Sequence, residues 1–421
     1  MSTTKNTRPS QGSVSVGHPV NVATGVLYHE FEDSMFTGRI PLVLPRRYST
    51  ALLENEAGIF GTGWHCPLSL KITRDLDGYR LTDPSGEADI VFNITNQRLF
   101  AGEVARNLGA FCELSVFGEE LRVTSWNVDS GEVFHDFYPV TQGGEWVSIV
   151  RRETADGNAL HFGYNDKNQL VEIKQENEQR SLRLAYDKHG RLVNVYRNSA
   201  ALQEDKQDSL PWLKYDYDKQ GQLIRFTNPM GASSHYKYDD SGRMINERTL
   251  TGMVYTFRFD DQGRCNFLSG KNKFDLQSLK YNDLNRLTEV TNSQGCTTTY
   301  HWNEFNQVEK VTSPAGRLNT TIYDDEDRII AEITPGGSTT KYAYDENGNR
   351  CAVTSPDGGV VHYTFNRSHQ VTSIIDPIGN QWSTQYDKNG RVTSVSNPLE
   401  AKQKYSYNQK GDLVKHEDSI G

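Results

Sequence analysis

The densest group of potential ligands in the sequence is the acidic run from Asp324 to Asp327. Four side-chain carboxylates on one turn offer the oxygen ligands that Ca²⁺ prefers, so the run could bind that ion weakly. The run also follows Tyr323 directly, at a point where the surrounding sequence predicts a turn. A solvated acidic loop is therefore the favoured interpretation, and a weak calcium site is the alternative.

Other residues that could do chemistry form no catalytic pattern. The eleven histidines are scattered, and the sequence contains no H-E-x-x-H, G-x-S-x-G or Walker motif. His18, His65 and His301 lie beside Pro or Trp, and we expect them to bond backbone groups rather than to catalyse. The glycine-rich stretch 58–63 is interpreted as a loop and not as a phosphate-binding site. We expect no catalytic residue, no cofactor and no metal site, and thus no enzyme.

The cysteines support neither a disulfide framework nor a zinc site. There are five, an odd number at wide spacings, and no C-x-x-C pair occurs. We expect them to be small buried hydrophobic residues. They are Cys66, Cys112, Cys265, Cys296 and Cys351.

Composition and charge exclude several classes of protein. Only 35% of the residues are apolar, but 21 Tyr, 17 Phe and 35 Gly favour strands and tight turns. The net charge of −9 argues against a nucleic-acid-binding protein, because such proteins need a basic face. The pairs Arg46-Arg47 and Arg151-Arg152 are isolated, and we expect them at solvated strand ends. No apolar run approaches the ~18–20 residues of a membrane span, and the polar N-terminus carries no signal peptide.

The strongest signal is an internal repeat, marked by an aromatic residue followed by Asp or Asn. From Tyr217 onward the repeat recurs every 21 residues, with one step of 22. We predict that these aromatic residues are structural. They are Tyr164, Tyr186, Tyr217, Tyr238, Phe259, Tyr281, Trp302, Tyr323, Tyr344, Phe365, Tyr386 and Tyr407.

Each repeat predicts two turns and two short strands. In 386–392 an Asp can bond backbone amides, and a Gly three residues later supplies the positive φ of a hairpin turn. About ten residues further along, Pro-containing turns such as 376–379 follow. The strand before each aromatic alternates with period two, as in Tyr342 and Tyr344, which predicts ladders of rings on one face. In the other strand apolar residues are three apart, as in Leu287 and Val290, which predicts a bulge.

The fold class predicted is therefore all-β, with hairpins forming one long antiparallel sheet. Residues 160–421 make up an array of about twelve hairpins, with a polar insertion near 198–210. Residues 17–159 lack the period but still contain strands, expected at 87–94, 114–126, 133–140 and 146–152. Residues 1–16 are expected to be disordered.

These motifs carry a resemblance to a known family. The repeat units, together with the segments 17–25, 41–49 and 61–65, resemble the Rhs/YD-repeat proteins of bacteria over residues 17–421. The resemblance implies a curled sheet that forms part of a hollow shell, or cocoon, around a C-terminal toxin. It also implies an origin among type VI secretion effectors, polymorphic contact-dependent toxins or insecticidal toxin complexes.

The sequence departs from that family after Tyr407, where it reaches a turn without the expected self-cleavage and toxin segments. We therefore expect the shell portion of a toxin used in interbacterial competition, paired with the rest of a shell or with a toxin polypeptide, and possible contact with secretion-spike proteins. The expected location is the cytoplasm before delivery by a type VI-like system. Residues 390–421 are expected to be frayed or to pair with another chain.

The alternative is a β-repeat protein that binds carbohydrate or another cell-surface ligand, and an enzyme is the third hypothesis. Sugar binding requires rings open to solvent. The discriminating observation is whether four rings are buried in ladders or open on a groove. They are Tyr342, Tyr344, Tyr363 and Phe365.

Overall fold

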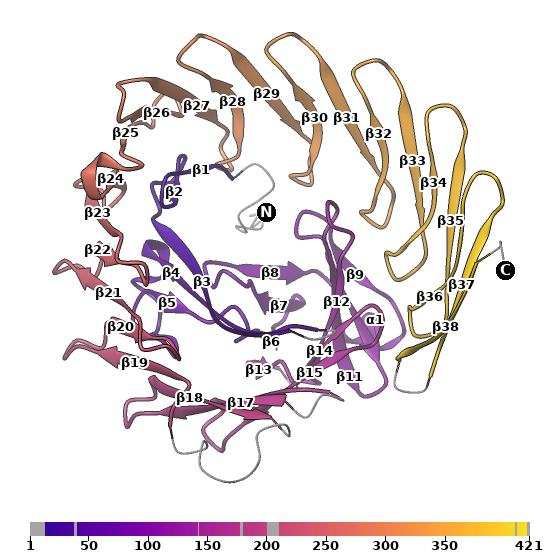
Figure 1. Cartoon of the computed structure of the whole chain (residues 1–421), viewed down its shortest axis with the longest axis horizontal. Coiled ribbons are helices and arrows are strands. Elements are labelled where there is room, and N and C mark those ends of the chain that lie inside the picture. The colour runs from indigo at the N-terminus through magenta and orange to yellow at the C-terminus, as the bar shows by residue number, and fades with distance from the viewer. Residues whose placement is uncertain are drawn as a thin grey trace. The chain divides into compact units, whose positions relative to one another are not determined.

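The computed structural model describes residues 13–37, 40–141, 143–176, 180–199, 210–408 and 411–418, and most of them lie in antiparallel strands (Figure 1). Helical structure in those ranges is limited to α1 (Asn96–Phe100), η1 (Thr50–Leu52) and η2 (Lys271–Lys273). The all-β prediction is confirmed.

The chain divides into two compact units. The first contains residues 1–72, 80–90 and 161–321, and the second contains 73–79, 91–160 and 322–421. Both units combine residues of the predicted N-terminal block with residues of the predicted array. Five strands have residues in both units: β6 (Lys71–Arg74), β7 (Tyr79–Thr82), β8 (Asp89–Phe92), β15 (Ala159–Tyr164) and β29 (Leu318–Tyr323).

The N-terminal strands of the first unit are β1 (Ser15–Val16), β2 (Val20–Asn21), β3 (Tyr28–Phe36), β4 (Leu42–Ser49) and β5 (Trp64–His65). β1 pairs with β2, and β3, β4 and β5 form a three-stranded antiparallel sheet. Of the segment 1–16 expected to be disordered, residues 1–12 lie outside the described residues. Ser15 and Val16 are ordered, because they pair with Asn21 and Val20.

The repeat strands of the first unit pair with their neighbours along the chain. The predicted insertion lies outside the described residues from 200 to 209. The strands are β16 (Leu170–Gln175), β17 (Arg180–Tyr186), β18 (Leu192–Ser199), β19 (Leu213–Tyr217), β20 (Leu223–Thr227), β21 (Ser233–Tyr238), β22 (Met244–Arg248), β23 (Val254–Phe259), β24 (Cys265–Gly270), β25 (Gln277–Asn282), β26 (Leu287–Asn292), β27 (Thr297–Trp302) and β28 (Val308–Thr312).

The second unit has an N-terminal part made of β9 (Ala105–Asn107), β10 (Cys112–Phe117), β11 (Glu120–Trp126), β12 (Val133–Pro139), β13 (Val147–Ser148) and β14 (Arg151–Thr154). The strand expected over 114–126 is a hairpin, since Phe117 pairs with Glu120 around Gly118.

The hairpins of the second unit follow one another along the chain, and each strand pairs with the next (Figure 1). They are built from β30 (Ile329–Ile333), β31 (Thr339–Tyr344), β32 (Arg350–Thr354), β33 (Val360–Phe365), β34 (Val371–Ile375), β35 (Gln381–Tyr386), β36 (Val392–Ser396), β37 (Lys402–Tyr407) and β38 (Leu413–Asp418).

The aspartate of the repeat motif builds the first turn as predicted. Asp387 accepts hydrogen bonds from the amides of Asn389 and Arg391, and its second oxygen lies 2.6 Å from Nη2 of Arg391. Gly390 has φ +75, a backbone conformation that residues with a Cβ adopt rarely. The same Asp–Arg pair closes the turns at Asp187, Asp239, Asp260 and Asp324.

The predicted bulge is present in most hairpins. In β19–β20, for example, Asp216 faces Arg225 and Tyr217 faces Leu223, so Ile224 is the extra residue. The pair Leu287 and Val290 is an exception, because β25 and β26 pair without a register shift. Here the prediction is wrong: Thr288, not Leu287, is buried, since a turn with Arg286 at φ +47 closes the hairpin differently.

Candidate functional site

One row of cross-strand pairs runs through consecutive hairpins, and we call it the central ladder. Each pair joins the residue two positions before a repeat aromatic to the residue nine positions after it. In the first unit the pairs are Leu184/Val195, Tyr215/Phe226, Tyr236/Glu247, Phe257/Leu268, Leu279/Val290 and Tyr300/Val311. In the second unit they are Tyr342/Val353, Tyr363/Ile374, Thr384/Val395 and Tyr405/His416.

In the first unit most of the central ladder is covered by the N-terminal segment. From Leu184 to Val290 every ladder residue is at most 5% exposed. The ring of Trp64 lies 5.2 Å from that of Tyr236, and the ring of Phe60 lies 5.2 Å from that of Tyr215. The aromatic rows predicted from sequence therefore form a buried core here, shared between repeats and N-terminal strands.

A buried ion pair lies in the same core. The side chains of Arg46 and Asp33 are 1% and 2% exposed, and Nε of Arg46 lies 2.5 Å from Oδ2 of Asp33. Arg46 also donates to the hydroxyl of Tyr236 at 3.0 Å, and its guanidinium lies 4.8 Å from the ring centroid of Trp64.

The expectation that the arginine pairs lie at solvated strand ends is therefore wrong for Arg46-Arg47. Arg47 is 5% exposed and forms ion pairs with Glu30 and Glu87. Arg151 and Arg152, in the second unit, are half-buried and pair with Glu120 and Asp136. Partner carboxylates from other segments of the chain, which the local sequence does not show, account for this burial.

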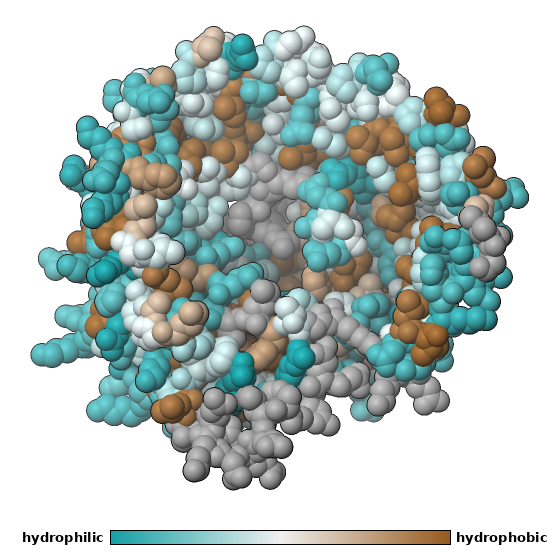
Figure 2. Space-filling view, viewed as in Figure 1, coloured by the Kyte–Doolittle hydropathy of each residue, from teal (hydrophilic) through white to brown (hydrophobic). Residues whose placement is uncertain are grey.

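In the second unit the same ladder is half open. Tyr342, Val353, Tyr363, Ile374 and Val395 are all of intermediate exposure. Hydrophobic residues also reach the surface among hydrophilic ones in the space-filling view (Figure 2). Tyr344 and Phe365 are likewise half-buried, so the four discriminating rings are neither sealed in a core nor fully open to solvent.

The repeat tyrosines join successive hairpins through their hydroxyl groups. In each case the hydroxyl donates to a backbone carbonyl at the start of the second strand of the preceding hairpin, 15 or 16 residues earlier except for Tyr217, where the intervening insertion makes it 25. The bonds are Tyr186 to Leu170, Tyr217 to Leu192, Tyr238 to Leu223, Tyr281 to Cys265, Tyr344 to Ile329, Tyr386 to Val371 and Tyr407 to Val392.

The turn arginines add a second connection between hairpins. Arg391 lies 4.9 Å from the ring centroid of Tyr407, in the next repeat, and Arg328 lies 4.5 Å from that of Tyr344. The aspartate thus orients an arginine that covers the following aromatic. The remaining repeat aromatics, Tyr164, Phe259, Trp302, Tyr323 and Phe365, lie at the ends of their strands in the same way.

We predict that Tyr238→Phe lowers the free energy of unfolding by ~1–3 kcal/mol. The hydroxyl of Tyr238 donates to the carbonyl of Leu223 at 2.6 Å and accepts from Nε1 of Trp64 at 3.0 Å, so the substitution removes two hydrogen bonds. The measurement is urea unfolding followed by circular dichroism. Tyr386→Phe, which removes one bond from a half-buried ring, is the matched control with a smaller loss. Equal losses in the two variants would contradict this assignment.

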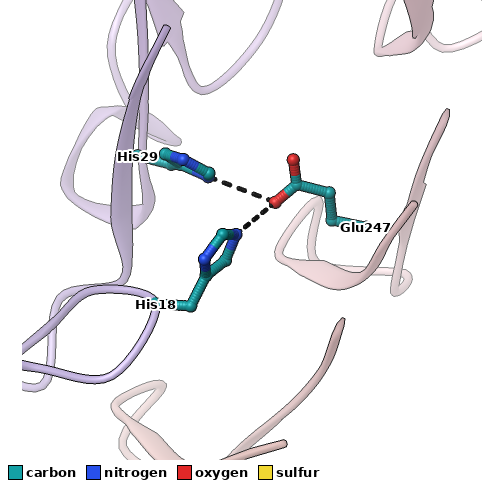
Figure 3. Close-up of side chains that lie close together, drawn as sticks. All are labelled: His18, His29 and Glu247. Atoms are coloured by element: carbon teal, nitrogen blue, oxygen red, sulfur yellow. Dashed lines mark hydrogen bonds and ion pairs between the residues drawn. The ribbon is translucent and has the colours of Figure 1, made fainter. Parts of the chain in front are cut away.

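Three side chains with metal-binding chemistry converge in the first unit (Figure 3). Glu247 lies on β22, His29 on β3, and His18 in the turn between β1 and β2. Oε2 of Glu247 lies 2.7 Å from Nε2 of His18 and 3.1 Å from Nδ1 of His29. Within the described ranges this is the one group of three or more His, Cys, Asp or Glu residues whose ligand atoms converge.

Electrostatics in this cluster favour an ionised carboxylate. Burial raises the pKa of Glu247, but the hydrogen bonds and charges of the two histidines outweigh it and lower that pKa to about 2. Burial lowers the pKa of His29, partly offset by Glu247. The bond from His18 goes to the carboxylate of Glu247, whereas the sequence predicts a bond to a backbone group.

The other sequence candidates lie outside this cluster. Asp324 is a turn aspartate that lies 2.8 Å from Nη2 of Arg328, and Asp327 has φ +67 in the place of the usual glycine. His65 lies on β5, where burial lowers its pKa to about 4, and His301 lies half-buried on β27. Stretch 58–63 is a loop whose Gly61 leaves no room for a Cβ, which would lie 2.3 Å from the carbonyl oxygen of Gly221.

The cysteines are all free, but the expectation of burial holds for three of them. Cys66, Cys112 and Cys265 are buried, whereas Cys296 is exposed and Cys351 is of intermediate exposure. Cys296 follows directly on the turn 292–295, where a side chain points into solvent without loss of packing.

Across the described parts of the chain, no helix is both long and apolar enough to cross a membrane.

Family models match three parts of the sequence. The model described as RHS Repeat matches residues 281–318, 323–360 and 365–402. The model described as Teneurin YD-shell matches residues 122–270, and a domain of unknown function, DUF6531, matches residues 17–90. No curated protein sequence matches the chain.

Among solved structures, the TcdB2-TccC3-Cdc42 structure is similar with a TM-score of 0.45 and 12% identity, over 90% of this chain and 24% of that one. The TcdB2-TccC3 structure gives 0.44 and 12%, over 93% and 25%. The Photorhabdus luminescens Tc holotoxin pore gives 0.41 and 12%, over 93% and 21%. The chain thus spans about a quarter of the first two chains, 24% and 25%.

Proposed function

Because this chain belongs to the Rhs/YD-repeat proteins, we propose that it forms part of the wall of a hollow shell in a bacterial toxin system and has no catalytic role. The observation that carries the proposal is the change along the central ladder. The ladder residues from Leu184 to Val290 in the first unit are buried, whereas the corresponding residues Tyr342, Val353, Tyr363, Ile374 and Val395 in the second unit are of intermediate exposure.

A row of half-open apolar side chains is unfavourable in water, and such surfaces usually have a partner. In the second unit Tyr342 lies directly opposite Val353 within one hairpin, and Tyr363 lies directly opposite Ile374 within the next hairpin. Together they place two rings and two aliphatic side chains on neighbouring hairpins. The partner proposed for this face is a polypeptide, because side chains of a second chain can pack between such rows.

The proposal extends to the partner of the chain and to the toxin system in which it acts. The partner is the rest of an Rhs shell or a toxin polypeptide, and the toxic activity resides outside residues 1–421. The system acts in interbacterial competition, with the protein in the cytoplasm before a type VI-like machine delivers it, where secretion-spike proteins are further partners. The net charge of −9 gives no support to a nucleic-acid partner.

The test is co-purification of the tagged chain with a toxin-type polypeptide encoded at the same locus. The wild-type chain should retain the partner. The double variant Tyr363→Asp/Ile374→Asp should bind at least about tenfold more weakly, because two carboxylates would have to be desolvated in the contact.

The matched control is His362→Asp, which adds one carboxylate on the same strand but at an exposed position beside Tyr363. It should bind as the wild type does. Retention of the partner by the double variant, or failure of the wild-type chain to retain any such polypeptide, would contradict the proposal.

A second candidate function, binding of carbohydrate or another cell-surface ligand, has one observation in its favour. A cavity of about 220 Å³ in the second unit is lined by Trp126, Tyr363 and Phe365 together with Asp129 and Arg350. Rings beside charged groups suit a sugar. Titration with oligosaccharides, monitored by tryptophan fluorescence, tests it: saturable quenching lost in Trp126→Ala supports this function, and no response in the wild type excludes it for the sugars tried.

A further inference from the structure

We propose that His18, His29 and Glu247 form a binding site for a divalent transition-metal ion, with Zn²⁺ as the best fit. The site lies within the first unit and is independent of the proposed function. It would connect the N-terminal segment to a repeat strand.

Glu247 breaks the pattern of the repeat. It occupies the ladder position nine residues after a repeat aromatic, where Phe226, Leu268 and Val290 stand in neighbouring repeats. Its side chain is 1% exposed, whereas Glu332 and His416, at the same position of later repeats, are exposed. Burying a carboxylate in an apolar slot is unfavourable unless it is paired, so its presence indicates a specific role at this repeat.

The carboxylate is only partly satisfied by its two histidines. Both nitrogens approach Oε2, while Oε1 of Glu247 is buried and has no hydrogen-bond partner. The three ligand atoms lie within 4.8 Å of one another. In a tetrahedral site with bonds of about 2.0–2.1 Å, ligand atoms are separated by roughly 3.3 Å. The separations of 2.7 and 3.1 Å between Oε2 of Glu247 and the two histidine nitrogens are shorter than that value, so the carboxylate would move away from both rings when an ion binds.

The kind of ligand selects the kind of metal. Two imidazoles and one carboxylate suit Zn²⁺, whereas Ca²⁺ and Mg²⁺ prefer sets made of oxygen. The side chains of His18 and His29 are 16% and 21% exposed, so water can complete the coordination from that side.

The histidine rings are held in place before any ion binds. The ring of His18 stacks on that of Tyr255 at 3.8 Å with an interplanar angle of 4°, and the ring of His29 lies 4.0 Å from that of Phe31. Ligands fixed by packing lose little freedom on coordination, which favours affinity. His18 and Glu247 are 229 residues apart in sequence, so a bound ion would cross-link distant segments and stabilise the folded state.

The experiment measures Zn²⁺ binding by the full chain. Protein is stripped with EDTA, loaded with ZnCl₂, desalted, and analysed for bound zinc by mass spectrometry and for affinity by isothermal titration calorimetry. The wild-type chain should retain one equivalent. Glu247→Gln and His29→Ala should each weaken Zn²⁺ binding by at least about 100-fold, more than loss of a supporting residue does. Bound Co²⁺ should show the intense visible absorption of a four- or five-coordinate ion.

His235→Ala is the matched control, because His235 is exposed on β21 and lies outside the cluster. It should bind Zn²⁺ as the wild type does. Circular dichroism establishes that each variant is folded. The zinc stoichiometry is measured on the wild-type chain, so it does not depend on the folding of any variant. No retained zinc in the wild type, or equal affinity in Glu247→Gln and His235→Ala, would overturn the proposal and leave the cluster as a hydrogen-bonded link.

Discussion

Replacing Arg46 by Met should lower the free energy of unfolding by ~3–5 kcal/mol, one of the two largest effects expected in this chain. The side chain of Asp33 is 2% exposed, and it would lose its counter-ion while keeping the hydrogen bond that the hydroxyl of Tyr215 donates at 2.9 Å. A buried carboxylate without its counter-ion is strongly unfavourable. Equilibrium unfolding in urea, followed by tryptophan fluorescence, measures the change.

Two further variants separate the charge from the packing. Arg46→Met combined with Asp33→Leu should recover much of the loss, because an apolar pair of similar volume is often as stable as a buried ion pair. Arg225→Met is the matched control, since Arg225 and Asp216 form an ion pair at 2.7 Å in which both side chains are about half exposed, 49% and 44%. It should change stability by less than ~1 kcal/mol. An equal loss of unfolding free energy in Arg46→Met and Arg225→Met would show that burial of the ion pair does not determine how much the pair contributes to stability.

Phe257→Ala should also lower the free energy of unfolding by ~3–5 kcal/mol, because its ring is 2% exposed and lies in the sealed part of the central ladder. Tyr363→Ala, at the corresponding position of the second unit, should lose only ~1–2 kcal/mol. Its ring is half exposed already, so less apolar area returns to water. Urea unfolding of both variants provides the comparison.

The same contrast can be tested with identical residue types. Val290 is 4% exposed and Val353 is half-buried, and both stand nine residues after a repeat aromatic. Val290→Ala should therefore lose more stability than Val353→Ala. The reverse order would mean that the ladder is packed equally in both units.

The sequence predicts the local structure well because each repeat carries its own turn chemistry. Asp387 and Gly390 lie three residues apart and fix the turn without help from elsewhere. The alternation of Tyr363 and Phe365 likewise identifies a strand and its covered face. Repetition of these local signals makes the long antiparallel sheet predictable.

What the sequence does not predict depends on contacts between distant segments. Arg46 has the local setting of a surface charge, yet Asp33, Tyr236 and Trp64 enclose it. His18 and Glu247 show no motif, being 229 residues apart. One signal was present all the same: Glu247 interrupts a position that is apolar in neighbouring repeats, and a charge at such a position indicates a buried polar contact.

The exposure of the ladder in the second unit also depends on contacts between distant segments. The pattern of Tyr342, Val353, Tyr363 and Ile374 matches that of the sealed ladder, and nothing local shows that these side chains lack a full cover. Exposure depends on which N-terminal segments pack on a given hairpin. That information lies in the tertiary structure alone.

The most direct test of the wall proposal is hydroxyl-radical footprinting of the ladder tyrosines in the purified chain, read by mass spectrometry. Tyr215 and Tyr236 are 2% exposed, while Tyr342 and Tyr363 are half-buried. We expect oxidation to be several-fold faster at Tyr342 and Tyr363 than at the two buried tyrosines, and both to be protected when the partner polypeptide is bound. Equal protection of all four tyrosines in the isolated chain would contradict it, because no open face would then exist for a partner to cover.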